Sequence, residues 1–167
     1  MPLILMRMKG LPRDMHLHPS YEALIDEAFA FLRERLRTAE AGGVSPARLL
    51  IDPGVGFGKG AQHDLELLRK LHHFHALGRP IVIGPSRKSF IGWILGTGVE
   101  ERLEGTAATV ATAIMQGASI IRVHDVRAMA HVARMMDALV RPHVTLPPKG
   151  QGLACTGQAR PNRQEKE

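Results

Sequence analysis

Four short runs of almost wholly apolar residues predict buried β-strands. They cover residues 3–8, 49–52, 81–84 and 119–124. A strand that is covered on both faces of a parallel sheet lacks the alternation of apolar and polar residues seen in a half-exposed strand. Each run is followed by a polar or glycine-rich loop, so the pattern predicts four buried strands that all run in the same direction.

Between and after these runs, apolar residues recur at helical spacing. The spacing predicts helices over residues 20–41, 63–77, 90–95, 103–116 and 127–140. Strands that alternate with helices are typical of α/β proteins with a parallel sheet. The sequence therefore predicts four βα units, which fit either a doubly wound sheet or half of a (β/α)8 TIM barrel.

The length favours one partial domain followed by a tail. A whole barrel takes about 250 residues, and the alternating pattern ends near residue 141. Residues 142–167 are rich in proline, glycine, glutamine and charge, a composition that cannot bury a core. We expect residues 1–141 to form the domain and residues 142–167 to be disordered.

Composition and sequence pattern argue against nucleic-acid binding, a membrane span and secretion. The net charge is +6, but no Lys/Arg run occurs and aromatic residues make up only 4% of the chain, which argues against nucleic-acid binding. The sequence contains no stretch of 18 apolar residues, so no membrane span is predicted. The start of the chain lacks the pattern of a signal peptide, and the single cysteine, Cys155, cannot form an internal disulfide. We expect a cytoplasmic protein.

The loop at residues 51–59 places Asp52 at the end of an apolar strand, followed by alternating glycines. A carboxylate there can accept hydrogen bonds from the ring NH and amino groups of a heterocycle, and the glycines let the backbone approach a flat ligand. The alternative is a glycine-rich turn in which Asp52 caps a local N–H. The spacing fits neither a Walker loop nor a dinucleotide-binding loop.

Two further loops carry cationic residues after predicted strands. Ser86, Arg87, Lys88 and Ser89 between a strand and a helix predict an anion site for a carboxylate or phosphate; the alternative is a solvated basic turn capped by Ser89. In the run at residues 119–124, alternation predicts that Arg122 and His124 point to the same side and grip a diphosphate.

Alternative roles remain for Arg122 and His124, and two other histidines also need an interpretation. Arg122 could pair with an internal carboxylate, and His124 could be structural. His72 and His75 have the spacing of a metal pair, but no carboxylate or cysteine accompanies them at ligand spacing, so a solvated helix face is favoured.

Segments 5–10, 52–59, 84–92 and 121–125, in this order and spacing, resemble the second half of the dihydropteroate synthase family. The resemblance covers residues 3–140 and implies the C-terminal half of a (β/α)8 barrel. It also implies a reaction: dihydropterin-methyl diphosphate and p-aminobenzoate are joined to give dihydropteroate for folate synthesis, and diphosphate is released, usually with Mg²⁺. Sulfonamides would compete as mimics of p-aminobenzoate.

The resemblance also implies three sets of site residues. Those for the pterin are Asp52, Lys88, Met6, Phe57, Gly56 and Gly84. Those for p-aminobenzoate are Ser86, Arg87, Lys88 and Phe57. Those for the diphosphate are Arg122 and His124.

The chain departs from the family pattern in what it contains and in what it lacks. Arg7 stands where the family usually has His, and Gly60 where it usually has Thr. The family's first four strands are absent, with the Asn that helps to hold Mg²⁺, so we expect no metal ligand in this chain. A half-barrel exposes two strand edges and an apolar face, which favours a homodimer or association with a missing N-terminal half. The alternative function is a non-catalytic pterin- or phosphate-binding half-barrel that dimerises.

Overall fold

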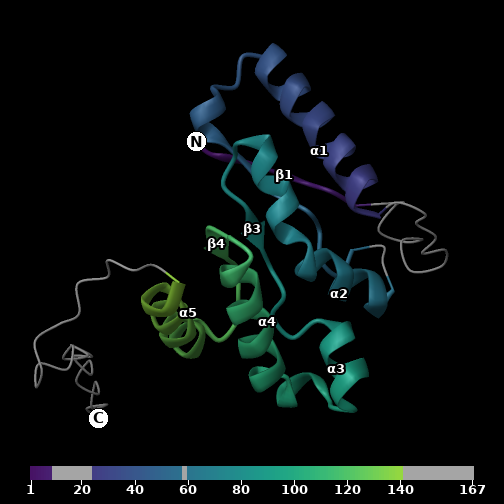
Figure 1. Ribbon diagram of the computed structural model, residues 1–167, viewed down its shortest axis with the longest axis vertical. Coiled ribbons are helices and arrows are strands. Elements are labelled where there is room, and N and C mark those ends of the chain that lie inside the picture. Colours follow the sequence, from purple (N-terminus) through teal and green to yellow (C-terminus); the bar gives the residue numbers. More distant parts are fainter. Residues whose placement is uncertain (9–23, 58–59, 141–167) are drawn as a thin grey trace, which may run out of the picture.

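The computed structural model describes residues 1–8, 24–57 and 60–140, and the chain is α/β (Figure 1). Four predictions concern residues outside these ranges. They are the helix start at residue 20, the loop residues Gly58 and Lys59, the tail at 142–167, and Cys155.

The strands are short, parallel, and ordered across the sheet as they are along the chain. They are β1 (Leu3–Met6), β2 (Leu49–Asp52), β3 (Val82–Ile83) and β4 (Ile120–Ile121). β1 pairs with β2 and β3 pairs with β4, both in parallel, and a bridge between Ile51 and Ile81 joins the two pairs. Strands β1, β3 and β4 end earlier than predicted, although Arg7 N–H still donates to Asp52 O at 2.9 Å and Arg122 N–H to Ile83 O at 2.8 Å.

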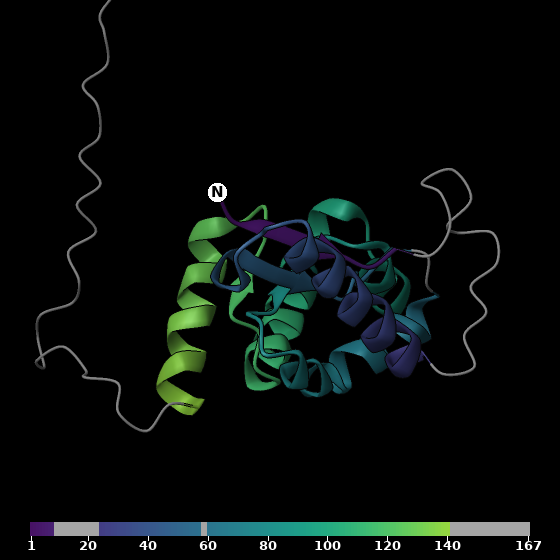
Figure 2. The ribbon, with the colours of Figure 1, turned by 90° about the horizontal axis from the view of Figure 1, so that it is seen from above.

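The described residues also form five α-helices and three short 3-10 helices. The α-helices are α1 (Leu24–Ala41), α2 (Ala61–Arg69), α3 (Ser89–Leu95), α4 (Leu103–Met115) and α5 (Val126–Val140). The 3-10 helices are η1 (Pro46–Arg48), η2 (Leu71–Leu77) and η3 (Val99–Glu101). Figure 2 shows α4 and α5 side by side at one end of the molecule. None of the described helices is both long enough and apolar enough to cross a bilayer.

The prediction of one helix over residues 63–77 is wrong. The α-helix ends at Arg69, and the chain continues through Lys70 as the 3-10 helix η2. Residues three apart lie directly above one another in a 3-10 helix, so Leu71 and Phe74 both face the interior and are completely buried. The sequence therefore predicts the apolar stripe correctly, but the part in η2 has 3-10 rather than α-helical geometry.

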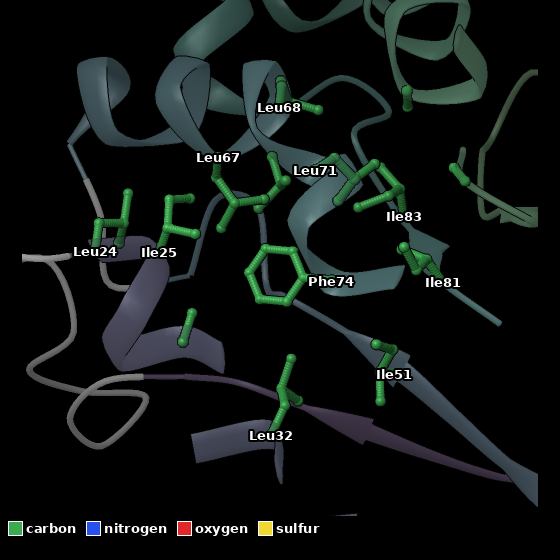
Figure 3. Packing of buried hydrophobic residues seen from close by; sticks show 14 of the residues in the cluster. Leu24, Ile25, Leu32, Ile51, Leu67, Leu68, Leu71, Phe74, Ile81 and Ile83 are labelled. Carbon is green, nitrogen blue, oxygen red and sulfur yellow. The ribbon is translucent and has the colours of Figure 1, made fainter. Parts of the chain in front are cut away.

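The core lies between α1, the helical segment α2–η2 and the inner strands. Figure 3 shows the Phe74 ring among Leu32 of α1, Leu67 of α2 and the strand residue Ile51. All four side chains are fully buried, and the removal of such aromatic and branched side chains from water is the main source of stability in a domain of this size. This packing fixes β2 and β3, and with them the loops that follow each strand.

The prediction that all four strands are buried on both faces is wrong for the outer two. β2 and β3 are almost wholly buried, whereas Leu3, Ile4 and Ile120 are 41%, 50% and 42% exposed. β1 and β4 are the outer strands of the described sheet, so each has a strand neighbour on one side only. The residues are apolar as expected for buried strands, but the described chain supplies nothing to cover them.

Candidate functional site

The candidate site lies where the parallel strands end. Asp52 is the last residue of β2 and pairs in register with Met6 of β1, while Gly84 follows β3 and Arg122 follows β4. Because the carboxyl ends of parallel strands meet at the same edge, the loops that the sequence singled out come together there.

The β2–α2 loop is shaped by two buried carboxylates. Asp52, only 4% exposed, accepts a hydrogen bond from Gly54 N–H at 2.8 Å through Oδ1. Asp64 of α2, also buried, accepts one from Gly56 N–H at 2.7 Å. Gly54 and Gly56 both have a positive φ, which favours glycine. The capping role that the sequence left open for Asp52 is therefore present, and its carboxylate also acts on Lys88 electrostatically.

Lys88 lies across this loop. Its ammonium donates a hydrogen bond to Val55 O and lies 4.1 Å from the centre of the Phe57 ring. A Cβ atom on Gly56 would collide with the Lys88 side chain where it now lies, so glycine leaves room for the lysine. Burial lowers the pKa of Lys88 to about 8; nearby Asp52 and Asp64 raise it, but not enough to offset the lost hydration.

Lys88 is expected to react with amine-directed reagents with a rate midpoint near pH 8, since its pKa is lowered to about 8. An ordinary lysine titrates near about 10.4. Reductive methylation of the chain over a series of pH values, with peptide mass spectrometry, measures this midpoint. Lys70, which is exposed and pairs with Glu66 at 2.9 Å, is the internal comparison. A Lys88 midpoint no lower than that of Lys70 would contradict the burial of its ammonium.

A cationic cavity of about 290 Å³ lies beside Lys88. It is lined by Gly84, Ser86, Lys88, Arg122, Val123 and His124. Ser86 Oγ accepts a hydrogen bond from His124 N–H at 3.1 Å and lies 2.9 Å from His124 Nδ1, so the two loops are joined inside the cavity. Arg122 and His124 therefore share one space, and a hydroxyl, an ammonium, a guanidinium and an imidazole suit a phosphate-like anion.

Arg87 does not line this cavity, although its two neighbours do. Its guanidinium bonds to Asp125 at 2.9 and 3.1 Å and to Glu100 at 2.8 Å. The hydrogen bonds with Asp125 raise the pKa of Arg87 and hold the pKa of Asp125 below its usual value. The structure therefore separates Arg87 from the other cationic side chains of the predicted site.

The remaining predicted residues lie around the same edge. Met6 is 37% exposed at the end of β1, opposite Asp52, and Phe57 lies beside Lys88. Ser89 begins α3 without a capping side-chain bond, so the capping alternative for this residue is not realised.

Sequence reasoning gave no role to two buried polar residues near the site. Asp64 holds Gly56, and Thr106 of α4, with no exposed surface, accepts a hydrogen bond from Arg87 N–H at 3.1 Å. Asp64 lies in the first turn of α2 on the same face as the buried Leu67 and Leu68, which was a usable signal. Thr106 lies among small residues of α4 and offered none.

The described part of the chain contains no cluster of side chains suited to magnesium. Residues 1–8, 24–57 and 60–140 contain no group of three or more His, Cys, Asp or Glu side chains arranged to hold a metal. His72 Nδ1 lies 2.7 Å from Gln116 Oε1 at the surface, and the ring of His75 packs against Gly117. The described residues therefore do not fit a Mg²⁺ ion on their own.

Comparison with known proteins links this geometry to one family. A family model described as "Pterin binding enzyme" matches residues 1–124. The chain is 41% identical over 138 residues to dihydropteroate synthase of Escherichia coli K12, a match that covers 83% of this chain and 49% of the relative. It is 45% identical over 141 residues to dihydropteroate synthase of Synechocystis, covering 84% and 49%.

A solved structure gives the same result. The Yersinia pestis dihydropteroate synthase in complex with a sulfonamide drug superimposes with a TM-score of 0.83 at 36% identity. The match covers 85% of this chain and 52% of that structure. The chain thus spans about half the length of the relatives it matches.

Proposed function

Because the chain belongs to the pterin-binding enzyme family, we propose that it carries the pterin- and diphosphate-binding part of a dihydropteroate synthase, a transferase of folate biosynthesis. In this proposal the chain is the C-terminal half of a (β/α)8 barrel, with four βα units in a domain at residues 1–141. The observation that carries the proposal is the meeting of Asp52, Lys88, Ser86, Arg122 and His124 at one edge of the sheet.

In the proposed reaction, the amine nitrogen of p-aminobenzoate attacks the methylene carbon of the pterin substrate. The new C–N bond forms as the C–O bond to diphosphate breaks, and the amine loses a proton. Negative charge grows on the leaving oxygen in the transition state. The fixed guanidinium of Arg122, with His124 beside it, would stabilise that charge without having to reorganise.

The pterin would bind on the β2–α2 loop. Asp52 would accept hydrogen bonds from ring N–H and amino groups, the glycine backbone at Gly56 would let the ring approach, and Phe57 and Met6 would border it. Lys88 would reach the edge of the ring. Its amino group is already partly buried, so binding would remove little further hydration from it.

We place p-aminobenzoate beside Ser86, Lys88 and Phe57. Sulfonamides would compete for this place, and the matched Yersinia pestis structure is a sulfonamide drug complex. The complete reaction also needs the part of the barrel that the matched half does not supply. A second candidate function is therefore a half-barrel that binds pterin or phosphate without turnover, which the exposed outer strands β1 and β4 favour.

Calorimetric titration of the chain with dihydropterin-methyl diphosphate tests the proposal. Binding is expected, and its absence in a folded chain would contradict a competent half-site. Product formation, measured with p-aminobenzoate present, then separates the transferase from the binding module.

Two variants are expected to weaken the binding of different ligands, which would show that the site residues have separate roles. Arg122→Ala should weaken binding of inorganic diphosphate about tenfold, because it removes a charge-assisted contact worth about 1.5 kcal/mol, and should leave binding of 6-hydroxymethyl-dihydropterin nearly unchanged. Lys88→Ala should instead weaken binding of 6-hydroxymethyl-dihydropterin. Arg35→Ala, an exposed arginine of α1, is the matched control. Equal losses for both ligands in both variants would contradict this division.

A further inference from the structure

Arg87 adopts an unusual backbone conformation. Its φ is +55°, and it is the one non-glycine residue of the described ranges with a positive φ. A side chain makes this left-handed conformation unfavourable, so surrounding contacts must maintain it. Ser86 and Lys88, on either side of this residue, both line the cationic cavity, whereas Arg87 does not.

Helix α4 and Arg102, the residue just before it, hold Arg87 from both sides of the residue. Arg87 N–H donates to Thr106 Oγ1 at 3.1 Å, and Arg102 Nη1–H donates to Arg87 O at 2.9 Å. Thr106 is completely buried, and the Arg102 guanidinium packs against Gly92, where any Cβ atom would collide with it. Both contacts therefore come from side chains that are themselves held in place.

The Arg87 side chain continues this connection to the next loop. Its bidentate pair with Asp125 reaches the residue that follows His124, and Glu100 binds its remaining nitrogen. The β3–α3 and β4–α5 loops are thus joined twice, by the Ser86–His124 contact inside the cavity and by the Arg87–Asp125 pair outside it.

We propose that Thr106 of α4 and Arg102, the residue just before that helix, fix the left-handed Arg87, and that Arg87 is a positioning residue that sets the separation of the two anion-binding loops. Arg87 then acts on substrate through Ser86 and Lys88 on one side and His124 on the other, and does not bind p-aminobenzoate itself. This assignment rests on the proposed function only where a substrate is named. The contacts themselves are independent of it.

Thr106→Val tests the proposal, with Thr106→Ser as its matched control. Valine keeps the size and branching but removes the acceptor of the Arg87 N–H, whereas serine keeps the hydroxyl. Three quantities are measured on the full 167-residue chain. They are the affinity for inorganic diphosphate, the titration midpoint of Lys88 by NMR, and the thermal unfolding midpoint.

Thr106→Val is expected to bind diphosphate about fivefold to tenfold more weakly, and the Lys88 midpoint should rise from about 8 towards the ordinary value of about 10.4 as the loop relaxes. Thr106→Ser should restore both to near the wild-type values. If Thr106→Val lowers only the unfolding midpoint, with affinity and Lys88 titration unchanged, Thr106 is merely structural and the proposal is overturned.

The titration midpoint of Lys88 tells failure of the proposed function apart from failure of the positioning role. If the wild-type chain binds no diphosphate, the proposed function fails, and the positioning role is then decided by whether Thr106→Val shifts the Lys88 midpoint. If Thr106→Val does not fold, Asp125→Asn replaces it. Asp125 is part-exposed, and its asparagine variant breaks the charge pair with Arg87 without opening the core. An unchanged Lys88 midpoint and diphosphate affinity in Asp125→Asn would overturn the proposal.

Discussion

Asp52→Asn is expected to weaken binding of dihydropterin-methyl diphosphate at least about 100-fold. The proposed pterin site uses the Asp52 carboxylate to accept two hydrogen bonds, and a bond to a charged acceptor contributes about 1.5 to 3 kcal/mol. Two lost bonds amount to about 3 kcal/mol, and each 1.4 kcal/mol is about tenfold in affinity. The asparagine amide would also direct its own N–H groups towards the donors of the ring, which discriminates more strongly than simple removal.

Asparagine is preferred to alanine because Asp52 also shapes its own loop. Its Oδ1 accepts the Gly54 N–H at 2.8 Å, and the amide oxygen of asparagine can keep that bond. Inorganic diphosphate, which would bind at Arg122 and His124, should therefore bind to Asp52→Asn with an affinity close to that of the wild type. Asp26→Asn on the exposed face of α1 is the control for the change in charge. Calorimetry that finds wild-type pterin affinity in Asp52→Asn would exclude this carboxylate as the pterin acceptor.

The strands and the loops after them could be predicted because the signals are local. A run of three apolar residues followed by Asp52 indicates a buried strand with a carboxylate at its end, whatever packs around it. Parallel strands then bring their loops to one edge, which is why Ser86, Arg122 and His124 line one cavity. The 3-10 geometry of η2 was not predictable in the same way, because Leu71, Phe74 and Leu77 fit either helical period.

The remaining differences depend on neighbours that are distant in sequence. Arg87 stands between two cavity residues, and only the fold shows that Asp125 and Glu100 draw its side chain to the other side. Burial of a strand likewise depends on what lies next to it. Ile4 and Ile120 have the composition of buried residues, but they lie on strands whose outer side is open in the described chain.

Those outer strands lead to the second large effect: the 167-residue chain by itself is expected to associate at micromolar concentration. Leu3, Ile4 and Met6 expose apolar surface along β1, and Ile120 does so on β4. Each outer strand also presents an edge that can pair with another strand. A second copy of the chain, or the other half of a barrel, could satisfy both needs by pairing with these edges and covering the apolar face.

Size-exclusion chromatography with light scattering is expected to give a mass above the 18.3 kDa of one chain. Ile4→Lys and Ile120→Lys together should return the chain to monomer, because lysine on an outer strand disfavours edge-to-edge pairing. Leu95→Lys, at an equally exposed apolar residue of α3, is the control and should leave the association intact. A well-folded wild-type monomer would contradict the prediction. A defined dimer would indicate that two copies cover each other's strands, whereas a broad distribution of masses would indicate open edge-to-edge growth, since only a paired arrangement uses up both edges.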